Sequence, residues 1–226
     1  MSKQDNTSAH LAKDYDSKIS STIPYYNSFH KEIINLVQSM DIQPNTWLDT
    51  GCGTGNFVEK ALKSFKSTQF LLADPSEGML KEAKEKLGKY GRVSFLNPAP
   101  TQEISIKQNV DVITAIQSHH YMSKDERFEA TKSCYNLIDK NGVFITFENI
   151  KPLTEKGIEI GKEYWKNFQI SHGKGIKEVE GHIKRFDVEY FPLTIEEHLS
   201  LLRDSGFSVV EMFWYSYMQA GFYCIK

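Results

Sequence analysis

Two aspartates and a run of glycines are the residues whose types and spacing point most directly to chemistry. Asp49 ends the apolar segment "TWLD", and Gly51, Gly53 and Gly55 follow it at alternate positions. Glycine is used where the backbone takes a positive φ, or where a ligand comes so close that a Cβ would obstruct it. The alternating glycines therefore predict a bare loop against which a ligand lies.

The spacing of these residues limits the kind of ligand. The third glycine comes one residue earlier than in a dinucleotide fingerprint, and Asn56 and Phe57 stand where a phosphate-binding loop would have Lys and Ser or Thr. Asp49 would repel a phosphate and attract a cation. Asp74 ends the next apolar segment, 25 residues later, close to the ~20-residue spacing of an acid that binds ribose hydroxyls. A ligand with a ribose, a positive charge and no phosphate is predicted, and S-adenosylmethionine (SAM) fits.

The elements that must position this loop alternate between strand and helix. The segments "TWLD", "QFLLAD", "RVSFL", "VDVITAIQS" and "GVFITFENI" read as strands, and amphipathic helical patterns lie between them. This alternation is typical of a parallel sheet with crossover helices, which puts the glycine loop at the carboxyl edge of the first strand. Ser123 with Glu126 and Thr194 with Glu197 have capping-box spacing and predict two helix starts. The last two apolar segments predict a hairpin.

The sequence also resembles a known family. "LDTGCGTGNF" resembles motif I, and "LLADPSEGML" the second motif, of the class I SAM-dependent methyltransferases. The resemblance covers residues 40–150 and resumes at "FPLTIEEHLSLLRDSGFSVVEMF". It implies an α/β, Rossmann-like three-layer sandwich with a seven-stranded, mostly parallel sheet of order 3-2-1-4-5-7-6, in which the last strand is antiparallel. We expect an N-terminal helical lid at 1–40 and a SAM-binding domain at 41–226, with a cap insertion at 151–191 between strands 5 and 6.

The same resemblance implies where SAM and its product, S-adenosylhomocysteine (SAH), would lie. The glycines would pass under the ligand, with Asp49 near the methionine end and Asp74 on the ribose. The family usually has an acid near the adenine after the third strand, and this chain has "LNPAPTQE", where Asn97 or a backbone group could substitute. The residues expected to bind the cofactor are Asp49, Gly51, Cys52, Gly53, Asp74, Pro75, Met79, Gln117, Tyr15 and Tyr25.

Candidate catalytic residues come from "QSHHYM" at the end of the fourth strand and from the lid. The family places this segment beneath the SAM methyl group, and imidazole titrates near neutral pH, so His120 and His119 are acid–base candidates. Tyr26 of the lid is a third. The alternative is that the histidines only shape the loop. Positioning can contribute ~7–11 kcal/mol, and a base about 10²–10⁴-fold in rate, so the sequence leaves the need for a base open.

Composition narrows the function. The formal net charge is -2, no apolar run reaches the ~18 residues of a membrane span, and the three cysteines lack metal-ligand spacing. We therefore expect a cytoplasmic methyltransferase that acts on a small-molecule acceptor, as a monomer or homodimer, without metal, nucleic acid or membrane.

Two other functions remain open from the sequence. "IPYYNSFHKEI" loosely resembles the enzyme that makes carboxy-SAM for tRNA wobble modification. That enzyme needs an arginine for the added carboxylate, and Arg185 and Arg203 are available. The third possibility is a non-catalytic SAM-binding protein, which would bind SAM without forming SAH.

Overall fold

A single seven-stranded sheet organises the chain. The computed structural model describes residues 7–8 and 10–226, so residues 1–6 and 9 of the expected lid lie outside it. The strands are β1 (Thr46–Thr50), β2 (Gln69–Ala73), β3 (Val93–Phe95), β4 (Val110–Ile116), β5 (Ile138–Asn149), β6 (Val209–Ser216) and β7 (Gln219–Ile225). Their order in the sheet is β3-β2-β1-β4-β5-β7-β6, which confirms the predicted order.

The strand directions also agree with the prediction. β1 pairs in parallel with β2 and β4, and β4 pairs in parallel with β5. β7 is antiparallel to both of its neighbours, β5 and β6. β6 and β7 together form the predicted hairpin. The carboxyl ends of β1, β2 and β4 therefore meet at one edge of the sheet, where ligands bind in open α/β folds.

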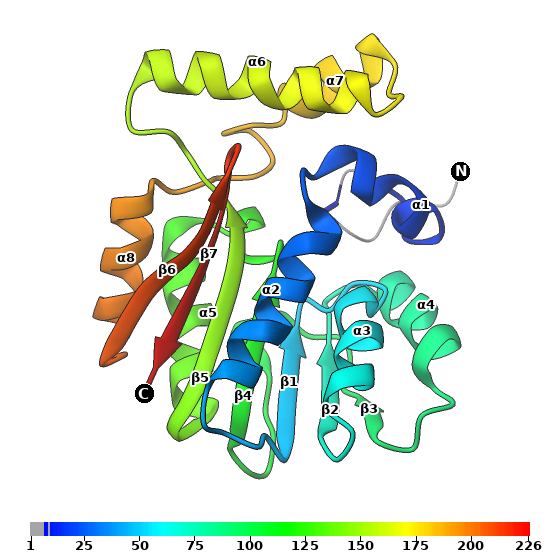
Figure 1. The fold of residues 1–226 in the computed structure, drawn as a ribbon, viewed down its shortest axis with the longest axis vertical. Helices are drawn as coiled ribbons and strands as arrows, with labels where there is room; N and C mark the ends of the chain where they lie inside the picture. The colour runs from blue at the N-terminus through cyan, green and yellow to red at the C-terminus, as the bar shows by residue number, and fades with distance from the viewer. Residues whose placement is uncertain (1–6, 9) are drawn as a thin grey trace.

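Helices cover both faces of the sheet (Figure 1). The apolar sides of α2, α3 and α4 join one hydrophobic core, and those of α5 and α8 join the core on the opposite face. These helices are α2 (Tyr26–Ser39), α3 (Asn56–Ser64), α4 (Glu77–Leu87), α5 (Lys124–Leu137) and α8 (Ile195–Asp204). Because both faces are covered, the central strands are apolar along their length, as the continuous pattern of β4 indicated.

Local signals in the sequence set where two of these helices begin. Ser123 accepts a hydrogen bond from the backbone N–H of Glu126, whose side chain accepts one in return from the backbone of Ser123, so both halves of the capping box are formed at α5. Thr194 and Glu197 form the same box at α8. Both predicted helix starts are confirmed.

The first helix of the expected lid and the cap lie beyond the carboxyl ends of the parallel strands, whereas α2, the other helix of the lid segment, packs on the sheet (Figure 1). The lid contains α1 (Ala12–Thr22), and the cap contains α6 (Glu155–Ser171) and α7 (Ile176–Ile183). Residues 151–191, the expected insertion, do not continue the alternation of strand and helix, and they hold these two helices. The indole N–H of the buried Trp165 in α6 donates to the carbonyl oxygen of Thr22 at 2.7 Å, so the cap is fixed to the end of the lid helix.

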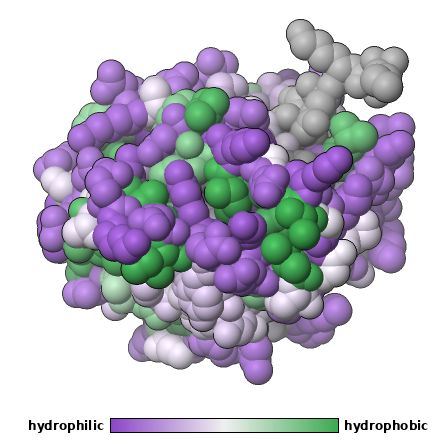
Figure 2. All heavy atoms as spheres, turned by 90° about the horizontal axis from the view of Figure 1, so that it is seen from above, coloured by the Kyte–Doolittle hydropathy of each residue, from purple (hydrophilic) through white to green (hydrophobic). Residues whose placement is uncertain are grey.

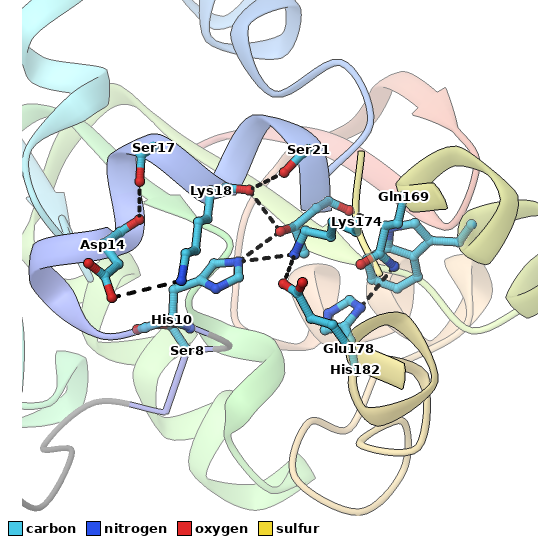
Figure 3. Close-up of polar contacts among 12 residues, drawn as sticks. Ser8, His10, Asp14, Ser17, Lys18, Ser21, Gln169, Lys174, Glu178 and His182 are labelled. Atoms are coloured by element: carbon cyan, nitrogen blue, oxygen red, sulfur yellow. Dashed lines mark hydrogen bonds and ion pairs between the residues drawn. The ribbon is translucent and has the colours of Figure 1, made fainter. Parts of the chain in front are cut away.

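A polar network joins the lid and the cap in a second place (Figure 3). Lys174 Nζ lies 3.0 Å from Glu178 Oε1 and 3.5 Å from His10 Nε2, which is 2.8 Å from the hydroxyl of Thr22. Seen from above, the face that carries the cap is mostly hydrophilic, with separate hydrophobic patches (Figure 2). No helix among residues 7–8 and 10–226 is both long and apolar enough to cross a membrane.

Candidate functional site

A pocket of about 250 Å³ opens at the carboxyl edge of the sheet. Its floor is formed by the loop after β1 and by the short 3-10 turn η2 (His119–Tyr121) after β4. α1 and the start of α2 cover it from the lid side. Because the lid helix forms one wall, a ligand in this pocket would be largely screened from water.

The three glycines of the loop have different roles. All have positive φ: +65° at Gly51, +54° at Gly53 and +77° at Gly55. A Cβ on Gly51 would lie 2.4 Å from the Cβ of Ser118, and one on Gly55 would lie 2.6 Å from a methyl carbon of Leu87. A Cβ on Gly53 would meet nothing within 4 Å. Two glycines are thus required by protein packing, and Gly53 faces open space in the pocket.

Asp74 holds the glycine loop and the start of α4 together. Its Oδ2 accepts the backbone N–H of Gly53 at 2.8 Å, and its Oδ1 accepts that of Ser76 at 2.9 Å. The residue lines the pocket and is 7% exposed. These bonds fix the carboxylate at the pocket wall with its orientation set before any ligand arrives.

Asp49 is buried at the end of β1 and lines the pocket. Burial raises its pKa to about 7, and the negative charge of Asp74 acts in the same direction, against the hydrogen bond that it accepts from Thr114. That bond joins Thr114 Oγ1 to Asp49 Oδ1 at 2.6 Å. A buried carboxylate of this kind is stabilised by a nearby cation.

The charges around the pocket select against phosphate. Its lining, taken over the described residues, includes the two carboxyls of Asp49 and Asp74 and no lysine or arginine. The positive φ and open space at Gly53 leave room for a ligand that lies flat on the loop. The donor set therefore fits a sulfonium nucleoside such as SAM.

The lid is tied to the glycine loop through Asp16. Its Oδ1 accepts the hydroxyl of Thr54 at 2.5 Å and the amide of Asn56 at 2.8 Å, and its Oδ2 lies 2.5 Å from Lys86 Nζ. Burial alone would raise the pKa of Asp16, but hydrogen bonds from these three residues hold it below its usual value. Tyr15, next to Asp16, lines the pocket.

The floor contains a histidine–carboxylate pair. Nδ1 of His120 lies 2.6 Å from Oε2 of Glu148, and both side chains are buried. Glu148 also accepts the backbone N–H groups of His119 and His120, each at 3.1 Å, and the hydroxyl of Thr146 at 3.0 Å. Burial alone would raise the pKa of Glu148, but the bond from His120 and the neighbouring charges lower it to about 2.

Most of the sequence-predicted site residues come together in this pocket. The pocket lining includes Asp49, Gly51, Cys52, Gly53, Asp74, Pro75, Met79, Gln117, Tyr15, Tyr26 and His120. Burial raises the pKa of the Tyr26 hydroxyl far above neutral pH, so this phenol stays protonated.

Three predicted residues lie elsewhere. His119 is absent from the pocket lining, and its Nε2 lies 3.3 Å from the hydroxyl of Thr101. Tyr25 is half exposed, has a positive φ before α2, and turns its ring towards Trp214 and Tyr217. Asn97 is exposed, and Pro100 and Thr101 line the pocket in its place.

Some pocket residues were not found from the sequence. Asn149 of β5 and His182 of the cap line the pocket, and Glu148 of β5 lies behind the lining, where it contacts His120. A charged residue at the end of the apolar run "GVFITFEN" was a usable signal for Glu148, because a buried carboxylate needs partners. His182 had no such signal, since its approach to the pocket depends on how the cap folds back.

A second, more polar pocket adjoins the first and shares Thr7, Ser8 and His182 with it. Arg185 lies here, with its Nε 2.6 Å from Oε2 of Glu189. Lys174 and Glu178 form a second ion pair in the same place (Figure 3). No cluster of three or more potential metal ligands was found in the described part of the chain.

Comparison with known proteins agrees with this geometry. Residues 48–144 match the family model "Methyltransferase domain". A carboxy-S-adenosyl-L-methionine synthase of Campylobacter lari is 26% identical over 219 residues, covering 93% of this chain and 90% of that protein.

Two solved structures share the fold. A candidate O-methyltransferase from Nostoc punctiforme has a TM-score of 0.70 and 16% identity, and the match covers 96% of this chain and 60% of that one. Magnesium protoporphyrin IX methyltransferase from Synechocystis, solved with SAH, has a TM-score of 0.65 and 15% identity, and the match covers 91% of this chain and 85% of that one. Together with the sheet order and the glycine loop, these matches show a methyltransferase domain over residues 48–144 and the fold of the class I SAM-dependent methyltransferases in the chain.

Proposed function

We propose that the protein is an enzyme that binds SAM in the pocket and transfers its methyl group to a small-molecule acceptor. The observation that carries this proposal is the pocket lining, in which two carboxyls and a bare glycine backbone occur without a lysine or arginine among the described residues. SAM would place its ribose on Asp74 and its positively charged end near Asp49. When bound, it supplies an activated methyl group on a sulfonium.

The residues of this chain would contribute binding, orientation and exclusion of water. Asp74 is held in place by Gly53 and Ser76, so little order is lost when it takes the ribose. α1 closes over the ligand, held by the Asp16 contacts with the glycine loop. Orientation of the acceptor against the methyl carbon can account for much of the rate, because positioning alone contributes ~7–11 kcal/mol in favourable cases.

A small acceptor is supported by the charge and shape of the site. The pocket is enclosed by the lid and the cap, and the chain has a formal net charge of -2. A macromolecular substrate such as nucleic acid would need an open, basic face. The acceptor would enter from the side of the cap, where Tyr190 and His182 line the pocket.

Carboxy-SAM synthesis is the second candidate, because the Campylobacter lari relative, whose match covers 93% of this chain, is named a carboxy-S-adenosyl-L-methionine synthase. The geometry favours methyl transfer. An added carboxylate needs a cation, and Arg185 lies in the adjoining pocket, engaged by Glu189 and by the carbonyl oxygen of Thr7. Arg203 lies on α8, which packs against the far face of the sheet.

Mass spectrometry separates these possibilities. Purified protein is incubated with SAM and a panel of small acceptors, and the nucleosides in the reaction mixture are then identified by their mass. Methyl transfer predicts SAH that forms only when acceptor and enzyme are both present. A SAM-derived nucleoside heavier by carbon dioxide, either formed with cell-extract metabolites or carried by the protein as purified, would support carboxy-SAM synthesis instead. SAM that binds and is recovered unchanged with every acceptor and extract would indicate a non-catalytic binding protein.

A further inference from the structure

His120, which lines the pocket, pairs with Glu148, which lies behind the lining, and the proposed contacts with SAM involve neither side chain. Glu148 is the penultimate residue of β5, in the buried half of the strand, and its side chain is fully buried. Two backbone N–H groups and the Thr146 hydroxyl already satisfy much of its capacity as an acceptor. The side chain nevertheless makes a fourth contact, at 2.6 Å, with Nδ1 of His120.

This contact sets the tautomer of the imidazole. Glu148 accepts three other hydrogen bonds, from the backbone N–H groups of His119 and His120 and from the Thr146 hydroxyl. Hydrogen bonds of this kind favour the ionised form of a carboxyl, and an ionised carboxylate can only accept hydrogen bonds. Nδ1 of His120 must therefore carry a proton. Burial lowers the pKa of His120 more than Glu148 raises it, so the ring is neutral near pH 7 and Nε2 has a free lone pair.

The position of the ring makes that lone pair available to a ligand. His120 lines the pocket, and in the described part of the chain Nδ1 is the ring nitrogen that has a hydrogen-bond partner. The rings of Tyr121 and Tyr190 flank it, with centroids 4.3 and 5.9 Å away. The charged groups that face it are Glu148 of β5, Arg127 of α5 and Arg185 of the segment after α7. Neither arginine lines the pocket.

We infer that His120 is the general base of the reaction, that Glu148 is the residue that positions it, and that the acceptor is a protic nucleophile, a hydroxyl or an amine. This inference rests on the proposed methyl transfer. As the acceptor atom forms its bond to the methyl carbon, its proton passes to Nε2 of His120. The electrons of the C–S bond remain on sulfur, which leaves as SAH. The imidazolium is stabilised by the Glu148 carboxylate and later releases its proton to solvent.

His30 is a matched control for the tautomer of His120. His30 is also buried and also lines the pocket, but its Nδ1 lies 2.9 Å from Nζ of Lys60. An ammonium only donates, so Nδ1 of His30 must accept and its ring proton must be on Nε2. The structure therefore predicts opposite tautomers for two buried histidines in one pocket.

Nitrogen NMR of the ligand-free protein tests the assignment without any acceptor. Long-range ¹H–¹⁵N spectra of histidine-labelled protein, assigned with His120→Gln and His30→Gln, are expected to show His120 neutral and protonated on Nδ1 from pH 6 to 8, and His30 protonated on Nε2. In Glu148→Gln, the His120 signal is expected to move towards a mixture of tautomers. Protonation of His120 on Nε2, or an imidazolium at pH 7, would overturn the inference.

Kinetics tests the catalytic role. With a panel of phenols, alcohols and amines, His120→Gln is expected to reduce SAH formation by about 10²–10⁴-fold while the Kd for SAM changes little. Undiminished SAH formation in this variant would refute the role of His120, and turnover confined to thiols would refute the acceptor class. A wild-type protein that binds no SAM would refute the proposed function itself. A protein that binds SAM but has His120 protonated on Nε2 would refute only this inference.

Discussion

Replacement of Asp49 by asparagine is expected to stabilise the protein at alkaline pH while weakening its ligand binding. Asp49 is buried, and its pKa is raised from 3.8 to about 7, first by burial and then by the charge of Asp74. A carboxyl whose pKa is raised by folding contributes stability that is present below its unfolded pKa and is lost as pH rises through the folded pKa. At pH 8 the ionised Asp49 therefore destabilises the folded protein, whereas a neutral asparagine in its place would not.

The size of the effect follows from the two pKa values. For a group that titrates at 3.8 when unfolded and at about 7 when folded, the loss between pH 5 and pH 8 is about 2–3 kcal/mol, at about 1.36 kcal/mol per pH unit. The Thr114 hydroxyl, which donates to Asp49 Oδ1, can still donate to the amide oxygen of the substituted side chain. We therefore expect Asp49→Asn to gain about that much stability over the wild type across this pH range.

Denaturant unfolding followed by tryptophan fluorescence, at pH 5 and pH 8, measures this difference. Asp139→Asn, which removes an exposed carboxyl from β5, is the control for the loss of one negative charge. A stability difference between Asp49→Asn and wild type that is the same at both pH values would refute the raised pKa. Saturating SAM is expected to reduce the difference at pH 8, because its cationic end would stabilise the Asp49 carboxylate.

Further predictions concern the glycine loop, the lid and the cap. Gly51→Ala is expected to unfold or severely destabilise the protein, because its Cβ would overlap Ser118, whereas Gly53→Ala should cost only about 1–2 kcal/mol of stability for its positive φ and weaken SAM binding; thermal melts with and without SAM compare the two. Equal melting temperatures for the two variants would contradict this difference in packing. Asp16→Ala should increase hydrogen exchange in α1 selectively, since it releases that helix from the glycine loop, and unchanged exchange would show that other contacts hold the lid. Trp165→Phe should lower the free energy of unfolding by about 1–3 kcal/mol, as a buried carbonyl loses its partner, which denaturant titration measures; a loss near zero would contradict it.

Much of the fold could be predicted because its signals are local. The glycine loop, the acids that end β1 and β2 and both capping boxes are each contained within a few neighbouring residues. The cap was harder, because α6 has one completely buried large apolar residue, Trp165, and two exposed ones, Ile160 and Tyr164. A helix that rests on a lid, not on the sheet, has only a narrow apolar face to reveal it.

The candidate site could likewise be predicted only in part from the sequence. Residues adjacent in the chain can face different ways: His120 lines the pocket, whereas His119 does not and instead contacts the hydroxyl of Thr101. No periodicity separates two residues within one 3-10 turn. The partnership of His120 with Glu148 depends on the pairing of β4 with β5, so the sequence could suggest the histidine but could not identify the carboxylate that holds it.

Calorimetric titration of SAM into the wild type, Asp74→Asn and Asp111→Asn tests the central claim most directly. Asp111 is the matched control, because it is also an aspartate that accepts backbone N–H groups, but at the start of β4, at the opposite edge of the sheet. The account predicts that SAM binds the wild type and Asp111→Asn alike, and binds Asp74→Asn about 10- to 100-fold more weakly, the cost of roughly 1–3 kcal/mol for unpaired buried polar groups. Equal affinity in Asp74→Asn, or a wild-type protein that ignores SAM and binds a phosphorylated nucleotide, would contradict it.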